Sequence, residues 1–311
     1  MPFAASGNSR IRTNIPAENA YNALNSANRD ISLRQLRLST GKRINNAADD
    51  VAGYITSRAL IARNGSLNQA LKAVGDASNM SQILQDGLDN INNLITLIKD
   101  SAANASSGAL GTDEKVALAK AAYRLSEQIQ TVADSTVFGG AQLLSGDFSA
   151  NFYIGLNATN DLLTLSIDMQ NENTDFNIDS NYFNVNSMSD GNFGGVTGLD
   201  LRELNDVSSE DLGVFSNENI NNTLVSLSNA LNNVNKVAAY LGGISNRLTS
   251  QEDVLQNQIT NYKAAISRIE DADVAKEQLE LIKSQFLQQA SLISLSQANQ
   301  NSSSFLGLLQ Q

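Results

Sequence analysis

The chain has 311 residues with no Cys, His or Trp, and its 32 Asp and Glu residues outnumber its 21 Lys and Arg residues, giving a net charge of −11. Without imidazole or thiol groups it lacks the residues that most metal sites, nucleophilic enzymes and disulfide frameworks use, so catalysis is not expected. The acidic balance also argues against nucleic acid as a partner, because a phosphate backbone is neutralised by Lys and Arg.

Neither membrane insertion nor a cleavable secretory signal is expected. No window of the sequence reaches the roughly 18 nearly uninterrupted apolar residues of a membrane span. Arg10 and Arg12 lie near the start, but no apolar stretch follows them. With only 5% aromatic residues, the composition favours narrow seams between long helices over large cores.

The first helix in chain order is expected in the N-terminal region before Gly41. Ala20, Leu24, Ala27, Ile31 and Leu38 share one register, and Gly41 is a typical helix stop. A second long helix is expected to begin near Ala47, where Asp49 and Asp50 favour the N-terminal end of the helix dipole. Its heptad positions are Leu84, Leu88, Ile91, Ile95, Ile98 and Ala102, and a break is predicted from Ser101 to Gly111.

The middle of the chain changes from heptads to short alternating runs. Asp113 and Glu114 open a third predicted helix that ends before Gly139-Gly140. Residues 152–154 and 163–167 then alternate like β-hairpin strands. The stretch 171–195 is rich in Asn, Asp, Ser and Gly, which leaves open whether it forms a small β domain or a long exposed excursion.

The clearest periodicity lies between residues 217 and 271, where positions spaced alternately by four and three residues are apolar except at Ser245 and Glu252. Counted from Ile220, the register reads Ile220, Leu224, Leu227, Leu231, Val234, Ala238, Leu241, Ser245, Leu248, Glu252, Leu255, Ile259, Tyr262, Ile266 and Ile269. This spacing predicts one long coiled-coil helix. A further helix is expected after Asp271 and Asp273, carrying Leu279, Ile282, Phe286, Ala290 and Ile293.

We therefore predict a mainly α fold, in which the N- and C-terminal regions form a long antiparallel coiled-coil helical bundle with a small β-rich or irregular central domain. The predicted segments are an N-terminal inner helix (1–46), two parts of a helical shell (47–145 and 216–271), a variable exposed centre (146–215) and a C-terminal inner helix (272–311).

Both ends of the chain carry apolar stripes that pairing with each other would cover only in part. The stripe residues are Ile15, Leu24, Ile31, Leu38, Ile282, Phe286, Ile293, Phe305, Leu306, Leu308 and Leu309. Leaving them in water is unfavourable by about 25 cal/mol per Å², which favours burial against other copies of the chain. The alternative from periodicity alone is an ordinary intramolecular helical bundle.

Motifs at both ends resemble bacterial flagellin. The N-terminal ones are Thr13-Asn14-Ile15, the run from Arg37 to Gly53 (RLSTGKRINNAADDVAG) and Phe138 to Leu144 (FGGAQLL). The C-terminal ones are Leu241 to Leu248 (LGGISNRL), Ser267 to Asp273 (SRIEDAD), and the Gln288-Gln289-Ala290 and Gln297-Ala298-Asn299-Gln300 segments. The resemblance covers roughly residues 10–145 and 215–311, in order and at suitable separations.

This resemblance implies a structural subunit that self-assembles into the extracellular, helical flagellar filament used for motility. It further implies secretion by flagellar type III export, and as partners other flagellin subunits, a flagellin export chaperone, and the flagellar cap and hook–filament junction proteins. The polar motif residues would cap helices or pair between subunits. They are Arg43, Asn45, Asp49, Asp50, Arg268, Glu270 and Asp271.

Two alternatives remain open. A hook–filament junction protein shares the terminal helices but usually has weaker forms of the Ser-Arg-Ile-Glu-Asp and Gln-Ala-Asn motifs. A secreted coiled-coil translocator would explain the heptads but not the ordered motifs at both ends. A flagellin with a zinc peptidase insert is excluded, because its ligand helix requires His.

Overall fold

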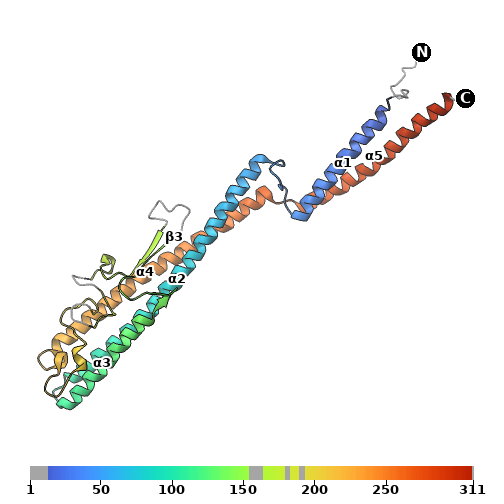
Figure 1. The fold of residues 1–311 in the computed structure, drawn as a ribbon. Coiled ribbons are helices and arrows are strands. Elements are labelled where there is room, and N and C mark those ends of the chain that lie inside the picture. Colours follow the sequence, from blue (N-terminus) through green and yellow to red (C-terminus); the bar gives the residue numbers. More distant parts are fainter. Residues whose placement is uncertain (1–12, 154–163, 179–182, 189–192, 310–311) are drawn as a thin grey trace. The chain divides into compact units, whose positions relative to one another are not determined.

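Long α-helices make up most of the chain, as the computed structural model in Figure 1 shows. The structure describes residues 13–153, 164–178, 183–188 and 193–309, and the side chains only as far as residue 300. The chain divides into two compact units. The terminal unit comprises residues 1–64 and 260–311, and the central unit comprises residues 65–259.

The terminal unit is built on helices α1 (Ile15–Thr40) and α5 (Val274–Leu309), which lie side by side (Figure 1). Asn14 caps α1 by accepting a hydrogen bond from Ala17 N, and Gly41 ends the helix with a left-handed φ of 69°. Asp273 caps α5 through Ala275 N and Lys276 N. The predicted end of the first helix at Gly41 is confirmed.

Helix α2 (Val51–Ala105) begins later than predicted. Asp49 uses its carboxylate to accept from Asn45 N and Asn46 N, which holds the preceding residues in a turn. Asp50 then accepts from Gly53 N and takes the cap position. At its other end the helix continues past the break predicted at Ser101, because Ala102 and Ala105 are fully buried.

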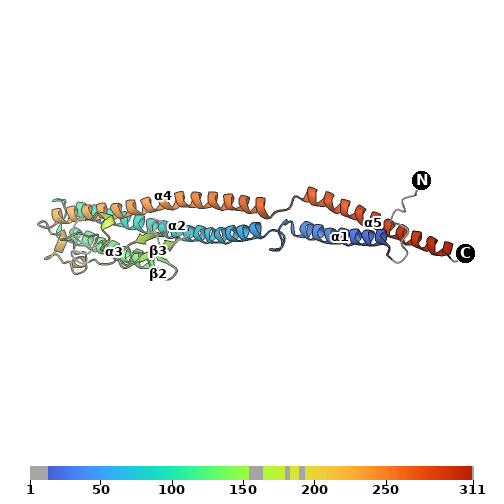
Figure 2. The ribbon, with the colours of Figure 1, turned by 90° about the horizontal axis from the view of Figure 1, so that it is seen from above.

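In the central unit, α2 and α4 (Ile220–Glu270) run alongside each other, with α3 (Thr112–Ser135) next to α2 (Figures 1 and 2). Asn92 Nδ2 donates to Asn235 Oδ1 at 2.6 Å, which joins α2 to α4. The predicted heptad side chains of α2 are fully buried. These are Leu84, Leu88, Ile91, Ile95 and Ile98.

Between Leu224 and Ser245, every second position of the predicted α4 register is only half-buried. Leu227, Leu248, Leu255 and Ile259 are buried as the register requires, whereas Leu224, Leu231 and Ile266 are only half-buried. The alternate buried positions lie one residue earlier, at Thr223, Ala230, Val237 and Ile244.

Loops of the central segment cause this shift. Thr223 Oγ1 donates to Val214 O at 2.6 Å, and Ser226 Oγ donates to Thr197 O at 3.3 Å. Gly194 lies directly against Ala230. Loops that pack this closely on a helix require small or hydroxyl side chains beneath them, so the larger leucines fall at the edge of the contact.

Two hairpins occupy the predicted β region. Strands β1 (Val137–Phe138) and β2 (Ala141–Gln142) are joined by Gly139 and Gly140, whose φ angles of 60° and 88° suit a tight hairpin turn. Strands β3 (Ser149–Tyr153) and β4 (Thr164–Asp168) pair antiparallel, from Ser149 with Asp168 to Tyr153 with Thr164. The predicted hairpin pattern is therefore confirmed.

Beyond β4 the described residues form an excursion that packs on α4 without a further strand. It contains the short 3₁₀ helices η3 (Thr174–Phe176), η4 (Glu203–Asn205) and η5 (Gly213–Phe215). Phe176 contacts Phe183 and Tyr240 edge-to-face, with ring centroids 5.9 and 5.3 Å apart. Of the stretch 171–195, the described residues 171–178, 183–188 and 193–195 form irregular structure around a small aromatic cluster.

Among the described residues, none of the helices is both long enough and apolar enough to cross a membrane.

The close approach of Gly194 to α4 gives a stability prediction. Its φ is +60°, and a Cβ there would lie 2.8 Å from Ala230 Cβ. We expect Gly194→Ala to lower the free energy of unfolding by about 1–2 kcal/mol for the left-handed backbone and by about 1–3 kcal/mol more for overpacking. Denaturant unfolding of the full chain measures this.

The matched control is Gly198→Ala, since Gly198 also has a positive φ, +79°, but an added Cβ would meet no atom within 4 Å. It is expected to lose only the backbone contribution of about 1–2 kcal/mol. Equal losses in the two variants would contradict a close loop–helix contact at Gly194.

Candidate functional site

The face that α1 and α5 present to each other combines small and polar side chains with aliphatic side chains that stay half-buried. Ala20 and Ala27 of α1 are buried, with Leu24, Ile31 and Leu38 half-buried along the same register. Facing them on α5 are positions that alternate by four and three residues, namely Glu277, Leu281, Ser284, Gln288, Ser291, Leu295 and Ala298. Among the described residues of this seam, only small or polar side chains are therefore fully buried, and the leucines and isoleucine stay half-buried.

Direct hydrogen bonds also link the two helices along this seam. Gln288 Nε2 donates to Asn28 Oδ1 at 2.7 Å, and Asn14 Nδ2 donates to Ala298 O at 3.0 Å. The predicted stripe of α1 thus faces α5, apart from Ile15, which is 43% exposed.

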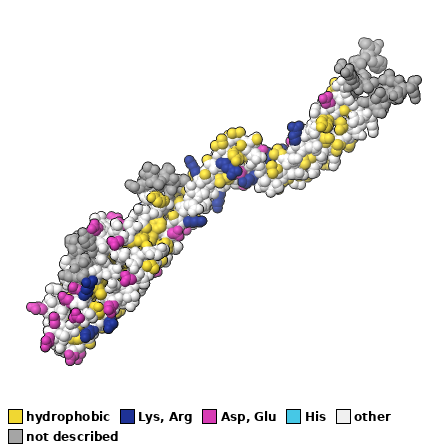
Figure 3. Space-filling view, in the orientation of Figure 1, with side chains coloured by type: hydrophobic (Ala, Val, Ile, Leu, Met, Phe, Trp, Pro, Cys, Tyr) yellow, Lys and Arg dark blue, Asp and Glu magenta, His cyan; other side chains and the backbone are white. Residues whose placement is uncertain are grey.

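Apart from Leu281 and Leu295, the large apolar side chains that the structure describes on α5 are exposed to solvent. We call Leu279, Ile282, Phe286 and Ile293 the outer stripe; Phe286 and Ile293 are each 68% exposed. Leu287 and Leu292 are also exposed, as are Tyr21 and Leu36 on α1. Figure 3 shows hydrophobic side chains at the surface of these helices. The apolar stripe was also predicted to include Phe305, Leu306, Leu308 and Leu309, whose side chains lie outside those that the structure describes.

A polar junction joins the segment after α1 to the segment between α4 and α5. Lys42 and Asp271 form an antiparallel bridge, with Arg43 N donating to Glu270 O at 2.6 Å and Ala272 N donating to Gly41 O at 2.9 Å. Residues that are more than two hundred positions apart in sequence are therefore held together by backbone hydrogen bonds.

Side chains reinforce the junction. Lys42 Nζ lies 2.7 Å from Glu270 Oε1, and this glutamate is 5% exposed. Arg43 donates to Ile269 O at 2.7 Å and lies 4.0 Å from Asp50. The structure thus brings most of the predicted polar residues together, including Asn45, whose amide donates to Lys42 O. Arg268 is exposed and has no ion pair among the described residues.

Sequence reasoning missed a second ionic cluster within the seam. Arg34 and Arg37 of α1 lie 2.8 and 3.3 Å from the two carboxylate oxygens of Glu277 on α5, whose side chain is 8% exposed. The available signal was the gap in the α1 register, because Arg34 occupies the heptad position between Ile31 and Leu38. Nε of each arginine is buried without a partner, which reduces the net stabilisation.

Two carboxylates of this unit titrate below their ordinary range. Burial alone would raise the pKa of Glu277, but hydrogen bonds and charge from Arg34 and then Arg37 outweigh it and hold the pKa below 4.5. Backbone hydrogen bonds from Asn46 and Asn45 lower the pKa of Asp49, which favours its charged form as a turn-forming acceptor.

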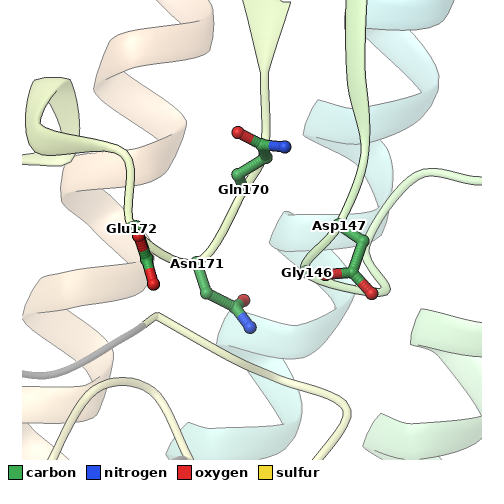
Figure 4. Close-up of a pocket in the computed structure, with 5 residues that line it drawn as sticks. All are labelled: Gly146, Asp147, Gln170, Asn171 and Glu172. Carbon is green, nitrogen blue, oxygen red and sulfur yellow. The ribbon is translucent and has the colours of Figure 1, made fainter.

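Among its described residues, the central unit offers no comparable cluster of paired charges. An open cavity of about 430 Å³ is lined by Gly146, Asp147, Gln170, Asn171 and Glu172. In Figure 4, Asp147 and Glu172 lie on opposite sides of it, with Asn171 between them. The described residues contain no group of three acidic side chains placed to hold a metal ion.

Acidification is expected to loosen the α1–α5 pair through Glu277. Because its folded pKa lies below the unfolded value, its stabilising effect is complete above about pH 4.5 and is lost as the pH falls through the folded pKa. Hydrogen exchange of α1 and α5 amides should therefore be steady from pH 7 to 5, after correction for intrinsic rates, and lose protection below pH 4.5.

Glu277→Gln should show reduced protection already at pH 7 and a smaller loss on acidification. Glu280→Gln serves as the matched control, because Glu280 pairs only within α5, 3.7 Å from Lys283. Identical exchange profiles for the two variants would contradict this role of Glu277.

Comparison with known proteins agrees with this architecture. The family described as the bacterial flagellin N-terminal helical region matches residues 11–149, and the bacterial flagellin C-terminal helical region matches residues 224–309. Flagellin FlaB1 of Treponema pallidum is 27% identical over 96% of this chain and 99% of its own length. Flagellin A of Vibrio cholerae and flagellin C of Vibrio anguillarum are each 26% identical with the same coverage.

The matched regions contain the terminal helices, the polar junction and most of the α2–α4 seam. Matches at both ends, together with relatives aligned over nearly their whole length, favour a filament subunit over a junction protein. The chain belongs to the bacterial flagellins, structural subunits of the flagellar filament rather than enzymes.

Proposed function

We propose that this flagellin polymerises through its terminal unit, with the outer stripe of α5 buried against neighbouring copies in an extracellular filament. The observation that carries the proposal is the inverted distribution of side chains on α5. The fully buried residues on its face toward α1 are small or polar, Leu281 and Leu295 are only half-buried there, and Leu279, Ile282, Phe286 and Ile293 face outward. Contact with a second copy of the chain would remove this stripe from water.

Repetition of one such contact produces a polymer. A surface that binds a different surface of the next copy, without closing into a ring, generates an open helical assembly. The exposed apolar side chains of α1, which include Ile15, Tyr21 and Leu36, provide further area for these contacts. Burial of a Leu- or Phe-sized side chain contributes about 1.5–3 kcal/mol, so a handful of residues per subunit suffices for strong association.

The polar motif residues divide between two proposed roles. Arg43, Asn45, Asp49, Asp50, Glu270 and Asp271 order the junction within each chain through the contacts described above. Arg268, exposed on α4, is proposed to pair with a carboxylate of a neighbouring subunit. Such a pair contributes about 0–1 kcal/mol to stability while it is exposed. Its contribution would therefore be larger only where the polymer buries it.

Partners other than flagellin itself follow from the family. A flagellin export chaperone is proposed to cover the outer stripe before assembly, since an uncovered stripe would promote premature association. The flagellar cap and the hook–filament junction proteins are proposed to contact the two ends of the polymer. If the chain were instead a junction protein, it would not form long filaments alone.

The outer stripe can be tested by substitution. Ile282→Gln, Phe286→Gln and Ile293→Gln together should leave the helical content of the monomer unchanged, because these side chains are exposed in it. If each buries about half its surface in the polymer, the loss is about 1 kcal/mol per residue, which raises the critical concentration about 100-fold. Sedimentation and electron microscopy after seeding with sheared filaments measure the effect.

The matched control keeps the stripe apolar through Ile282→Leu, Phe286→Leu and Ile293→Leu, and should assemble nearly as the parent does. A chain without residues 1–40 and 280–311 should form no filaments. Unchanged assembly of the glutamine variant would overturn the proposed interface, and failure of the parent chain to extend seeds would favour the junction-protein alternative.

A further inference from the structure

The net negative charge of this flagellin is concentrated in one segment. Residues 146–219 contain thirteen Asp and Glu residues and a single basic residue, Arg202, for a net charge of −12. All other residues together contain 20 Lys and Arg and 19 Asp and Glu, for a net charge of +1. The helical regions that the flagellin family shares are thus almost neutral, and the central segment accounts for the whole net charge of −11.

Most of the carboxylates that the structure describes in this segment are exposed and form no ion pair with another described residue. Eight of them are solvent-exposed, namely Asp147, Glu172, Asp175, Glu203, Asp206, Glu210, Asp211 and Glu218. No ion pair between described residues involves the segment. Figure 3 shows acidic side chains gathered over the loops of the central unit. Some, such as Asp211, accept a backbone hydrogen bond that shapes a turn, but most face water alone.

Assembly would bring many copies of this acidic segment close to one another. Every copy in a helical polymer has the same environment, so the acidic segments repeat at the subunit spacing. Unpaired carboxylates are too costly to bury, which keeps the segments in solvent. Like charges then face each other across water, where salt governs the range of their repulsion.

We propose that the acidic central segment makes assembly of this flagellin depend on ionic strength, by a repulsion between copies that opposes the apolar contacts of the terminal helices. The inference rests on the proposed polymerisation through the terminal unit. The Debye length is about 30 Å at 0.01 M salt and about 8 Å at 0.15 M, so raising the salt over this interval removes most of the repulsion between segments.

The test compares the parent chain with a five-site variant, Glu172→Gln, Asp175→Asn, Asp206→Asn, Glu210→Gln and Glu218→Gln. These carboxylates were chosen because no hydrogen bond or ion pair between described residues uses them. In seeded assembly followed by sedimentation, the critical concentration of the parent should fall by about 10-fold or more between 10 and 150 mM NaCl. The variant should change by less than about 3-fold and assemble at 10 mM.

A charge-preserving control exchanges Asp for Glu, and Glu for Asp, at the same five positions and should behave as the parent does. Circular dichroism and thermal unfolding verify that all three proteins fold alike. Equal salt dependence of the parent and the neutralised variant would overturn the inference while leaving polymerisation intact. Absence of filaments from all three at every salt concentration would instead refute the proposed function.

Discussion

The fold of the terminal unit is constrained by an apolar surface that one chain cannot cover. Helix α5 places Ala298, Ser284 and Glu277 against α1 and leaves Phe286 and Ile293 in water. A seam whose fully buried residues are small or polar allows two helices to approach closely but provides limited hydrophobic stabilisation. In the polymer proposed above, burial of the outer stripe would couple the ordering of these helices to association.

In the central unit, by contrast, apolar side chains are covered within the chain. Its α2 seam is fully buried from Leu84 to Ile98, and the aromatic cluster around Phe176 closes the loops onto α4. Such a unit is stable within one chain because its apolar side chains have partners inside it. One chain thus combines a self-sufficient part with a part that needs other copies.

Sequence periodicity predicted the helices, the helix stop at Gly41 and the hairpins, since each depends on local chemistry. It misplaced half of the α4 register because a heptad pattern identifies a face only to within one position. The choice between Leu224 and Thr223 was decided by the loop carrying Val214, which contacts the helix from a distance in sequence. A pattern of spacings contains no information about which loop will cover a helix.

The candidate site was predictable to a similar degree. The motif around Arg43 and that around Glu270 were both visible, but their pairing into a junction depends on the antiparallel alignment of α1 and α5. Glu277 gave no signal of its own, because a glutamate in the first turn of a helix is ordinarily explained by the helix dipole. Only the gap at Arg34 in an otherwise apolar register indicated a buried partner.

Buried charge also explains how a weak seam can be aligned uniquely. Alanine and serine pack almost equally well when one helix slides by a heptad, so they specify register poorly. A buried ion pair contributes little net stability, yet separating its partners leaves uncompensated charge in the interior. Glu277 against Arg34 and Arg37, and Glu270 against Lys42, therefore penalise every shifted alignment. Because a helical polymer requires the same surface on every copy, fixing this register also fixes where the outer stripe is presented.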